Sequence, residues 1–282
     1  MKRFVDWMAA NKAVHIVIIV LYYISVVLPH KRFGTFLNDT VVGGLGINNN
    51  TAEGRGEYNF YAISIALILL ASLLFFFIKY SRKLADRSLI WTYMIINIVL
   101  AFLIVEYLFV VNIEFVHFPQ YAVFAILLFP LIGNYRSTMI WATLAGSIDE
   151  AYQYFYLRDT GHYDFNDVLT NLVGVVFGLL LLRSMNVKEH SVFKLWKSTF
   201  WYGIVGIALV VFGLHASDIL SIYPSEEHNY HIMKKMPDQF WSKIHPNVTY
   251  HIVRPMEGLA LTCALWFFFS KIGDNTRAKI NE

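Results

Sequence analysis

Long apolar runs alternate with short polar or basic connections along most of this chain. A helix needs about 20 mostly apolar residues to cross a bilayer, and eight runs approach that length. The predicted spans are Val14–Leu28, Phe60–Ile78, Leu89–Val110, Phe118–Ile132, Thr138–Tyr156, Val168–Leu182, Trp201–His215 and Pro255–Lys271. The pattern therefore predicts an all-α polytopic membrane protein with eight transmembrane helices.

Composition strengthens this prediction. Hydrophobic residues make up 57% of the 282 residues and charged residues only 15%, whereas a soluble domain carries about 25% charged residues. The single cysteine, Cys263, excludes a disulfide within one chain and a cysteine-based metal site. No small-residue cleavage site follows the first apolar run, so we expect that helix to be retained rather than removed as a signal peptide.

Basic residues indicate the orientation of the spans. Of the 23 Lys and Arg residues, 15 fall in segments that would share one side of the membrane. They are Lys2, Arg3, Lys12, Lys79, Arg82, Lys83, Arg87, Arg136, Arg183, Lys188, Lys194, Lys197, Lys271, Arg277 and Lys279. Basic residues favour the cytoplasmic side, so both termini are predicted to be cytoplasmic.

The predicted spans form three parts. Residues 1–88 make a two-helix extension with an outer loop rich in Gly and Asn, residues 89–183 make a four-helix core, and residues 184–282 make a second two-helix extension. The last part contains a long outer loop, residues 218–254. Within that loop, apolar residues at helical spacing predict an amphipathic helix over Tyr230–Ile244, lying on the membrane surface or packed on the bundle.

Polar side chains concentrate at the outer ends of three core spans. Asp149, Glu150 and Gln153 close one span, and His117 and Tyr121 open the span before it. Glu114 precedes that opening, and Arg158, Asp167 and Asn171 follow toward the next span. Ionisable groups at membrane depth are costly and are functional by default. The plainer alternative is structural, with ion pairs and amide hydrogen bonds that fasten the helices together.

This polar pattern resembles the VanZ-like family of bacterial membrane proteins over residues 89–183. That family shows a polar residue and H-F-x-x-Y at the start of one span and D-E-x-x-Q-x-F at the end of the next. An arginine, one or two aspartates and N-x-x-G-x-x-x-G follow. The matching residues here are Glu114, His117, Phe118, Tyr121, Asp149, Glu150, Gln153, Phe155, Arg158, Asp164, Asp167, Asn171, Gly174 and Gly178.

The resemblance implies a location and a class of ligand. Members are associated with resistance to teicoplanin-type glycopeptide antibiotics, which implies a bacterial cytoplasmic (inner) membrane protein that acts on or binds a lipid or lipid-linked cell-envelope precursor. Either Asp164 or Asp167 matches the family aspartate, and Asp167 fits better because it lies four residues before Asn171. The resemblance implies no particular reaction.

The residue types suggest several chemistries. Glu150, His117, Asp149 and Asp167 are candidates for acid–base catalysis. Candidates for substrate binding are Arg158, which suits a phosphate, together with Gln153, Asn171 and Tyr121. Glu114, His117, Glu150 and Asp167 are candidate ligands of a divalent cation.

Two other functions remain open. The cluster could serve a lipid transporter or flippase without catalysis, or it could be structural in an accessory membrane subunit. The chain has no phosphate-cradling glycine loop and no nucleotide fingerprint, and its basic residues are dispersed. We therefore expect a membrane lipid as the partner, with neither nucleotide nor nucleic acid.

Overall fold

A computed structural model gives the structure of the protein. It describes residues 7–8, 10–29, 52–82, 84–109, 112–157, 163–190, 241–245 and 248–273, together with short pieces between 36 and 231.

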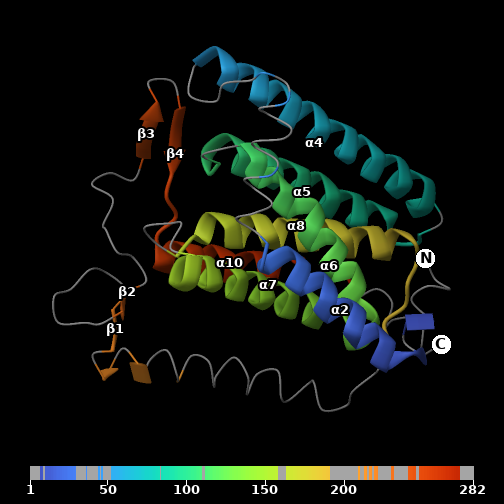
Figure 1. The fold of residues 1–282 in the computed structure, drawn as a ribbon. Coiled ribbons are helices and arrows are strands. Elements are labelled where there is room, and N and C mark those ends of the chain that lie inside the picture. The colour runs from blue at the N-terminus through green and yellow to red at the C-terminus, as the bar shows by residue number, and fades with distance from the viewer. Residues whose placement is uncertain are drawn as a thin grey trace.

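The described chain is mainly helical (Figure 1). The α-helices are α2 (Lys12–Val27), α4 (Ala52–Ser81), α5 (Arg87–Tyr107), α6 (His117–Ile132), α7 (Tyr135–Tyr152), α8 (Phe165–Ser184) and α10 (Pro255–Phe269). A 3-10 helix, η2 (Asn112–Val116), leads into α6, and a π-helix, η3 (Gln153–Leu157), continues α7. Seven predicted spans coincide with helices, whereas Trp201–His215 lies almost entirely outside the described residues.

Four of the described helices are long and apolar enough to cross a membrane. They are Phe60–Ser81, Arg87–Tyr107, Glu114–Ile132 and Phe165–Ser184. The apolar helices α2 and α10 are shorter. The protein is therefore a helical integral membrane protein.

Helix α8 lies at the centre of the assembly, packed against α5, α6, α7 and α10 (Figure 1). Gly174 and Gly178 are the reason that α6 comes so close. A Cβ on Gly174 would lie 2.6 Å from the carbonyl oxygen of Phe118, and one on Gly178 would lie 2.2 Å from that of Ala122. G-x-x-x-G spacing is typical of close contacts between membrane helices, and the structure shows such a contact between α6 and α8.

The C-terminal end of α8 carries a buried ion pair. A guanidinium nitrogen of Arg183 contacts the carboxylate of Asp86, which precedes α5. The two side chains are 4% and 6% exposed. Arg183 also donates from Nε to the carbonyl oxygen of Ile272 at 3.2 Å. One cation therefore ties together the connections that flank α5, α8 and α10.

The outer loop differs from its prediction. The expected helix over Tyr230–Ile244 is wrong at both ends, which are strands β2 (Tyr230–His231) and β3 (Trp241–His245). β2 pairs in parallel with β1 (Leu220–Ser221). β3 pairs with β4 (Val248–His251), antiparallel with an irregularity between Lys243 and His245. Aromatic and β-branched residues favour strands when a partner strand is available, and helical spacing in one segment does not reveal that partner.

Candidate functional site

A polar cluster occupies the space between the start of α6, the end of α7 and the start of α8. His117 of α6 donates from Nδ1 to Oδ1 of Asn171 on α8, at 2.9 Å. Because the amide oxygen can only accept, this bond places the ring proton on Nδ1. Nδ2 of Asn171 in turn donates to Oε1 of Glu150 on α7 at 3.5 Å. A single chain of contacts therefore joins the three helices.

The end of α7 supplies the carboxyl groups. Tyr121 of α6 donates its hydroxyl to Oδ2 of Asp149 at 2.9 Å. Nε2 of Gln153 lies 3.4 Å from Oδ1 of Asp149 and 3.3 Å from Oε1 of Glu150. Gln153 begins the π-helix η3, and its N–H donates to the carbonyl oxygens of Asp149 and Glu150. Such π-helical turns within helices are frequent at functional sites.

The two aspartates at the start of α8 have different positions. Asp164 is the N-cap, and its Oδ1 accepts from the N–H groups of Asn166 at 2.9 Å and Asp167 at 3.4 Å. Asp167 lies inside the first turn, with Oδ2 3.8 Å from Nε2 of His117. Its other oxygen, Oδ1, is buried and has no hydrogen-bond partner in the described part of the chain. Asp167 therefore belongs to the cluster, while Asp164 starts the helix.

The cluster is buried and rich in acid groups. Asp149, Glu150 and Asn171 are no more than 2% exposed, and His117 and Gln153 are also buried. In the part of the chain that the structure describes, neither Asp149 nor Glu150 forms an ion pair with Lys or Arg. Buried charges are normally paired. The cluster thus differs from the Arg183–Asp86 pair at the C-terminal end of α8, where the buried carboxylate has an arginine as its partner.

The structure thus brings seven of the predicted site residues into one cluster. They are His117, Tyr121, Asp149, Glu150, Gln153, Asp167 and Asn171. Arg158 lies outside the described residues. Glu114 is half-buried in η2, one turn before His117. Among the described residues, no group of three or more His, Cys, Asp or Glu side chains is arranged to hold a metal ion.

Two tyrosines that were not among the predicted site residues also contact the helices of the cluster, although Tyr163 lies in the same polar stretch of sequence. Tyr23 of α2 donates its hydroxyl to the carbonyl oxygen of Ala145 at 2.7 Å, one turn before Asp149. Tyr163 donates to the carbonyl oxygen of Ser147 at 2.8 Å, and burial raises the pKa of this phenol. Helix α2 was assigned to an extension outside the core, and nothing in its own sequence indicates that Tyr23 lies beside α7.

Asn166 is a structural anchor at the same end. Its Nδ2 donates to the carbonyl oxygens of Leu108 and His251, both at 2.9 Å. Its Oδ1 accepts from the N–H of Val253 at 2.9 Å. One amide therefore ties the start of α8 to the end of α5 and to the segment between β4 and α10. Because its partners are distant backbone groups, local sequence gives no signal for this role.

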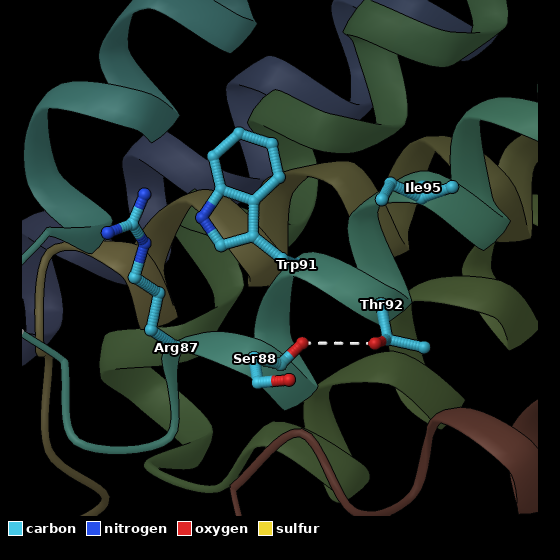
Figure 2. A pocket seen from close by; sticks show the side chains of 5 residues that line it. All are labelled: Arg87, Ser88, Trp91, Thr92 and Ile95. Carbon is cyan, nitrogen blue, oxygen red and sulfur yellow. Dashed lines mark hydrogen bonds between the residues drawn. The ribbon is translucent and has the colours of Figure 1, made fainter.

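A pocket of about 560 Å³ lies elsewhere, along the first turns of α5. Figure 2 shows its lining residues, Arg87, Ser88, Trp91, Thr92 and Ile95. None of them was a predicted site residue. The pocket is close to the Arg183–Asp86 pair, since Asp86 directly precedes Arg87.

Comparison of the chain with known protein families, with curated proteins and with solved structures finds no match.

Proposed function

We propose that the protein is a VanZ-like bacterial inner-membrane protein whose polar cluster binds the polar part of a membrane lipid or a lipid-linked cell-envelope precursor. The proposal includes eight spans with both termini in the cytoplasm. This topology puts the ends of α7 and the starts of α6 and α8 in the outer leaflet, where such precursors are exposed. The sequence resemblance over residues 89–183 supports the ligand class and the link to glycopeptide resistance.

The observation that carries the proposal is the excess of acid over base in a buried site. Asp149, Glu150 and Asp167 face one imidazole, His117, and no Lys or Arg among the described residues. A purely structural cluster would be expected to pair its charges, because an unpaired buried charge is expensive. A cluster that keeps several carboxyl groups close together is suited to accepting hydrogen bonds from a ligand or exchanging protons with it.

The proposed roles follow from the contacts. Glu150 accepts from two amides, Gln153 and Asn171, so it is held in position for a hydroxyl or amide of the ligand. Nε2 of His117 and Oδ2 of Asp167 lie 3.8 Å apart, too far for a direct hydrogen bond, so a hydroxyl of the ligand that lies between them can exchange a proton with either group. Arg158, five residues after Gln153 in the sequence, is proposed to bind a phosphate.

The test separates binding from folding. We expect each of three variants, Glu150→Gln, Gln153→Ala and Arg158→Ala, to abolish glycopeptide resistance. Each should also lose the lipid that co-purifies with the wild type and is identified by mass spectrometry. Membrane insertion and yield should remain at the wild-type level. Asn166→Ala is the matched control, since Asn166 is a buried amide with only backbone partners. It should lower yield and function together. If the three cluster variants behave like Asn166→Ala, the proposal is wrong.

Catalysis is tested separately from binding. The purified protein is incubated with polyprenyl-linked phosphates, with and without a chelator. Product formation that the chelator blocks would indicate a divalent cation, and binding without turnover would indicate recognition or transport.

The second candidate function is structural, in an accessory subunit. The observation in its favour is that most of the cluster's side chains hydrogen-bond to one another, as in the bonds from Tyr121 to Asp149 and from His117 to Asn171. Hydrogen bonds of this kind between membrane helices contribute about 0.6–2 kcal/mol each. This function predicts losses of stability in proportion to the bonds removed.

A further inference from the structure

A second site lies at the other end of the helical core. α5 has 21 residues, and at 1.5 Å per residue it is about 31 Å long, close to the thickness of a bilayer's hydrocarbon core. Its last turn is next to the polar cluster, because Asn166 donates to Leu108. Its first turn, which carries Arg87, is therefore at the opposite membrane surface. The pocket of Figure 2 is at that surface.

The pocket combines a free cation with apolar walls. Arg87 is exposed and, among the described residues, takes part in no ion pair. The neighbouring carboxylate, Asp86, is already held by Arg183. Lys79, in the last turn of α4, and Arg82, directly after that helix, add positive charge nearby in the sequence. The surface at this end of α5 therefore attracts anions.

Two hydrogen-bond donors, the Trp91 indole and the Arg87 guanidinium, belong to the lining of the pocket. In Figure 2 the indole nitrogen of Trp91 is on the side toward the Arg87 guanidinium. The N–H of that indole is buried and has no acceptor in the described part of the chain. The indole itself is held by an edge-to-face contact with Phe77 of α4, with ring centroids 5.1 Å apart. An acceptor oxygen bound at the Arg87 guanidinium would satisfy both groups after a small turn of the indole that exposes its N–H.

The remaining lining residues suit the part of a ligand below its headgroup. Ser88 presents an exposed hydroxyl in the first turn, and the Thr92 hydroxyl donates to the carbonyl oxygen of Ser88 at 3.0 Å. Ile95, one turn further into the membrane, is 54% exposed. The lining thus changes from charged to apolar along the helix, as the chemistry of a phospholipid does from phosphate to acyl chain.

We propose that this pocket binds an anionic glycerophospholipid of the cytoplasmic leaflet. Its phosphate lies between Arg87 and Trp91, and one acyl chain lies along Ile95. The pocket, of about 560 Å³, is shallow and widely open, which suits a lipid whose remaining surface stays in the bilayer. Anionic lipids are concentrated in the cytoplasmic leaflet, where basic residues next to spans attract them. The inference rests on the proposed topology, which puts this end of α5 at the cytoplasmic surface, and not on the ligand proposed for the polar cluster.

The test measures lipid retention by native mass spectrometry on the full-length protein in neutral detergent, titrated with phosphatidylglycerol or with phosphatidylcholine. We expect phosphatidylglycerol to bind the wild type preferentially and Arg87→Gln to weaken it about tenfold, the scale of one charge-assisted hydrogen bond. Trp91→Phe keeps a ring against Phe77 and removes only the N–H, so we expect a loss of about threefold.

Arg136→Gln is the matched control, because Arg136 is an exposed arginine at the predicted cytoplasmic surface and outside the pocket. The Arg136→Gln variant should bind phosphatidylglycerol as tightly as the wild type does. Equal weakening by Arg87→Gln and Arg136→Gln would show diffuse charge attraction and overturn the proposal. Displacement of the lipid by glycerol 3-phosphate at equal concentration would show that the pocket takes a soluble phosphate compound, which also overturns it.

Discussion

The two ends of α8 solve the problem of buried charge in different ways. At the end of the helix, Arg183 meets Asp86 in a pair that is almost fully enclosed. At the start, Asp149, Glu150 and Asp167 lie near His117, with no Lys or Arg among the described residues. At the C-terminal end of α8 the positive and negative charges are balanced, and the pair fastens the connections of the bundle. The start of the helix has an excess of acid, which is why we attribute function to it.

The largest expected effect is on the balanced end. Arg183→Met leaves the Asp86 carboxylate buried without its cation, which should lower the free energy of unfolding by about 3–5 kcal/mol. The measurement is unfolding by SDS in mixed micelles. Adding Asp86→Leu to the same protein should restore most of the loss, since an apolar pair avoids the unpaired charge. If Arg183→Met alone is as stable as the wild type, the Arg183–Asp86 pair is not structural.

Helix packing comes next, because it holds the two ends together. Gly178→Ala puts a Cβ 2.2 Å from the carbonyl oxygen of Ala122, so α6 and α8 must separate. Overpacking of this kind costs about 1–3 kcal/mol, and the separation should also weaken the contact between His117 and Asn171. Gly213→Ala is the control, since no atom of the described residues lies within 4 Å of its added Cβ. Equal unfolding midpoints for the two variants would contradict the close contact.

Asn166→Ala measures how much a purely structural side chain contributes to the free energy of unfolding at the start of α8, beside the acidic cluster. It removes three hydrogen bonds to backbone groups and should lower the free energy of unfolding by about 1–3 kcal/mol. Hydrogen exchange of the Val253 amide should speed up, because that N–H loses its acceptor. Unchanged exchange at Val253 would argue against this anchor.

The smallest effect on stability is expected for Glu150→Gln. The amide keeps an oxygen that can accept from Gln153 and Asn171, while the negative charge disappears. We expect the free energy of unfolding to change by less than about 1 kcal/mol, although function is lost. A drop as large as that of Asn166→Ala would remove the distinction between the two ends and favour a structural cluster.

Part of this architecture is readable from residue patterns. The apolar runs place the helices α2, α4, α5, α6, α7, α8 and α10, because a membrane-crossing helix must be apolar over most of its length. Gly174 and Gly178 indicate a close helix contact, and that contact is with α6. Spacings of three and four residues also put Asp149 and Glu150 beside Gln153.

Other features have no local signal. Asp86 and Arg183 are 97 residues apart in the sequence, and no pattern near either one names its partner. The strands at Tyr230–His231 and Trp241–His245 replace an expected helix, since strand pairing depends on a second segment. The pocket beside Arg87 depends on where Phe77 holds the Trp91 ring, which is a matter of packing between two helices.

The amino-acid sequence by itself therefore determined a helical membrane protein and the polar residues at the helix ends, because hydrophobicity and helical period are properties of neighbouring residues. Only the tertiary structure decided which of those groups meet. It joined His117 to Asn171, paired Arg183 with Asp86 and left the Trp91 indole facing Arg87. Contacts of this kind arise from the packing of helices distant in sequence, and their geometry has no counterpart in the order of residues.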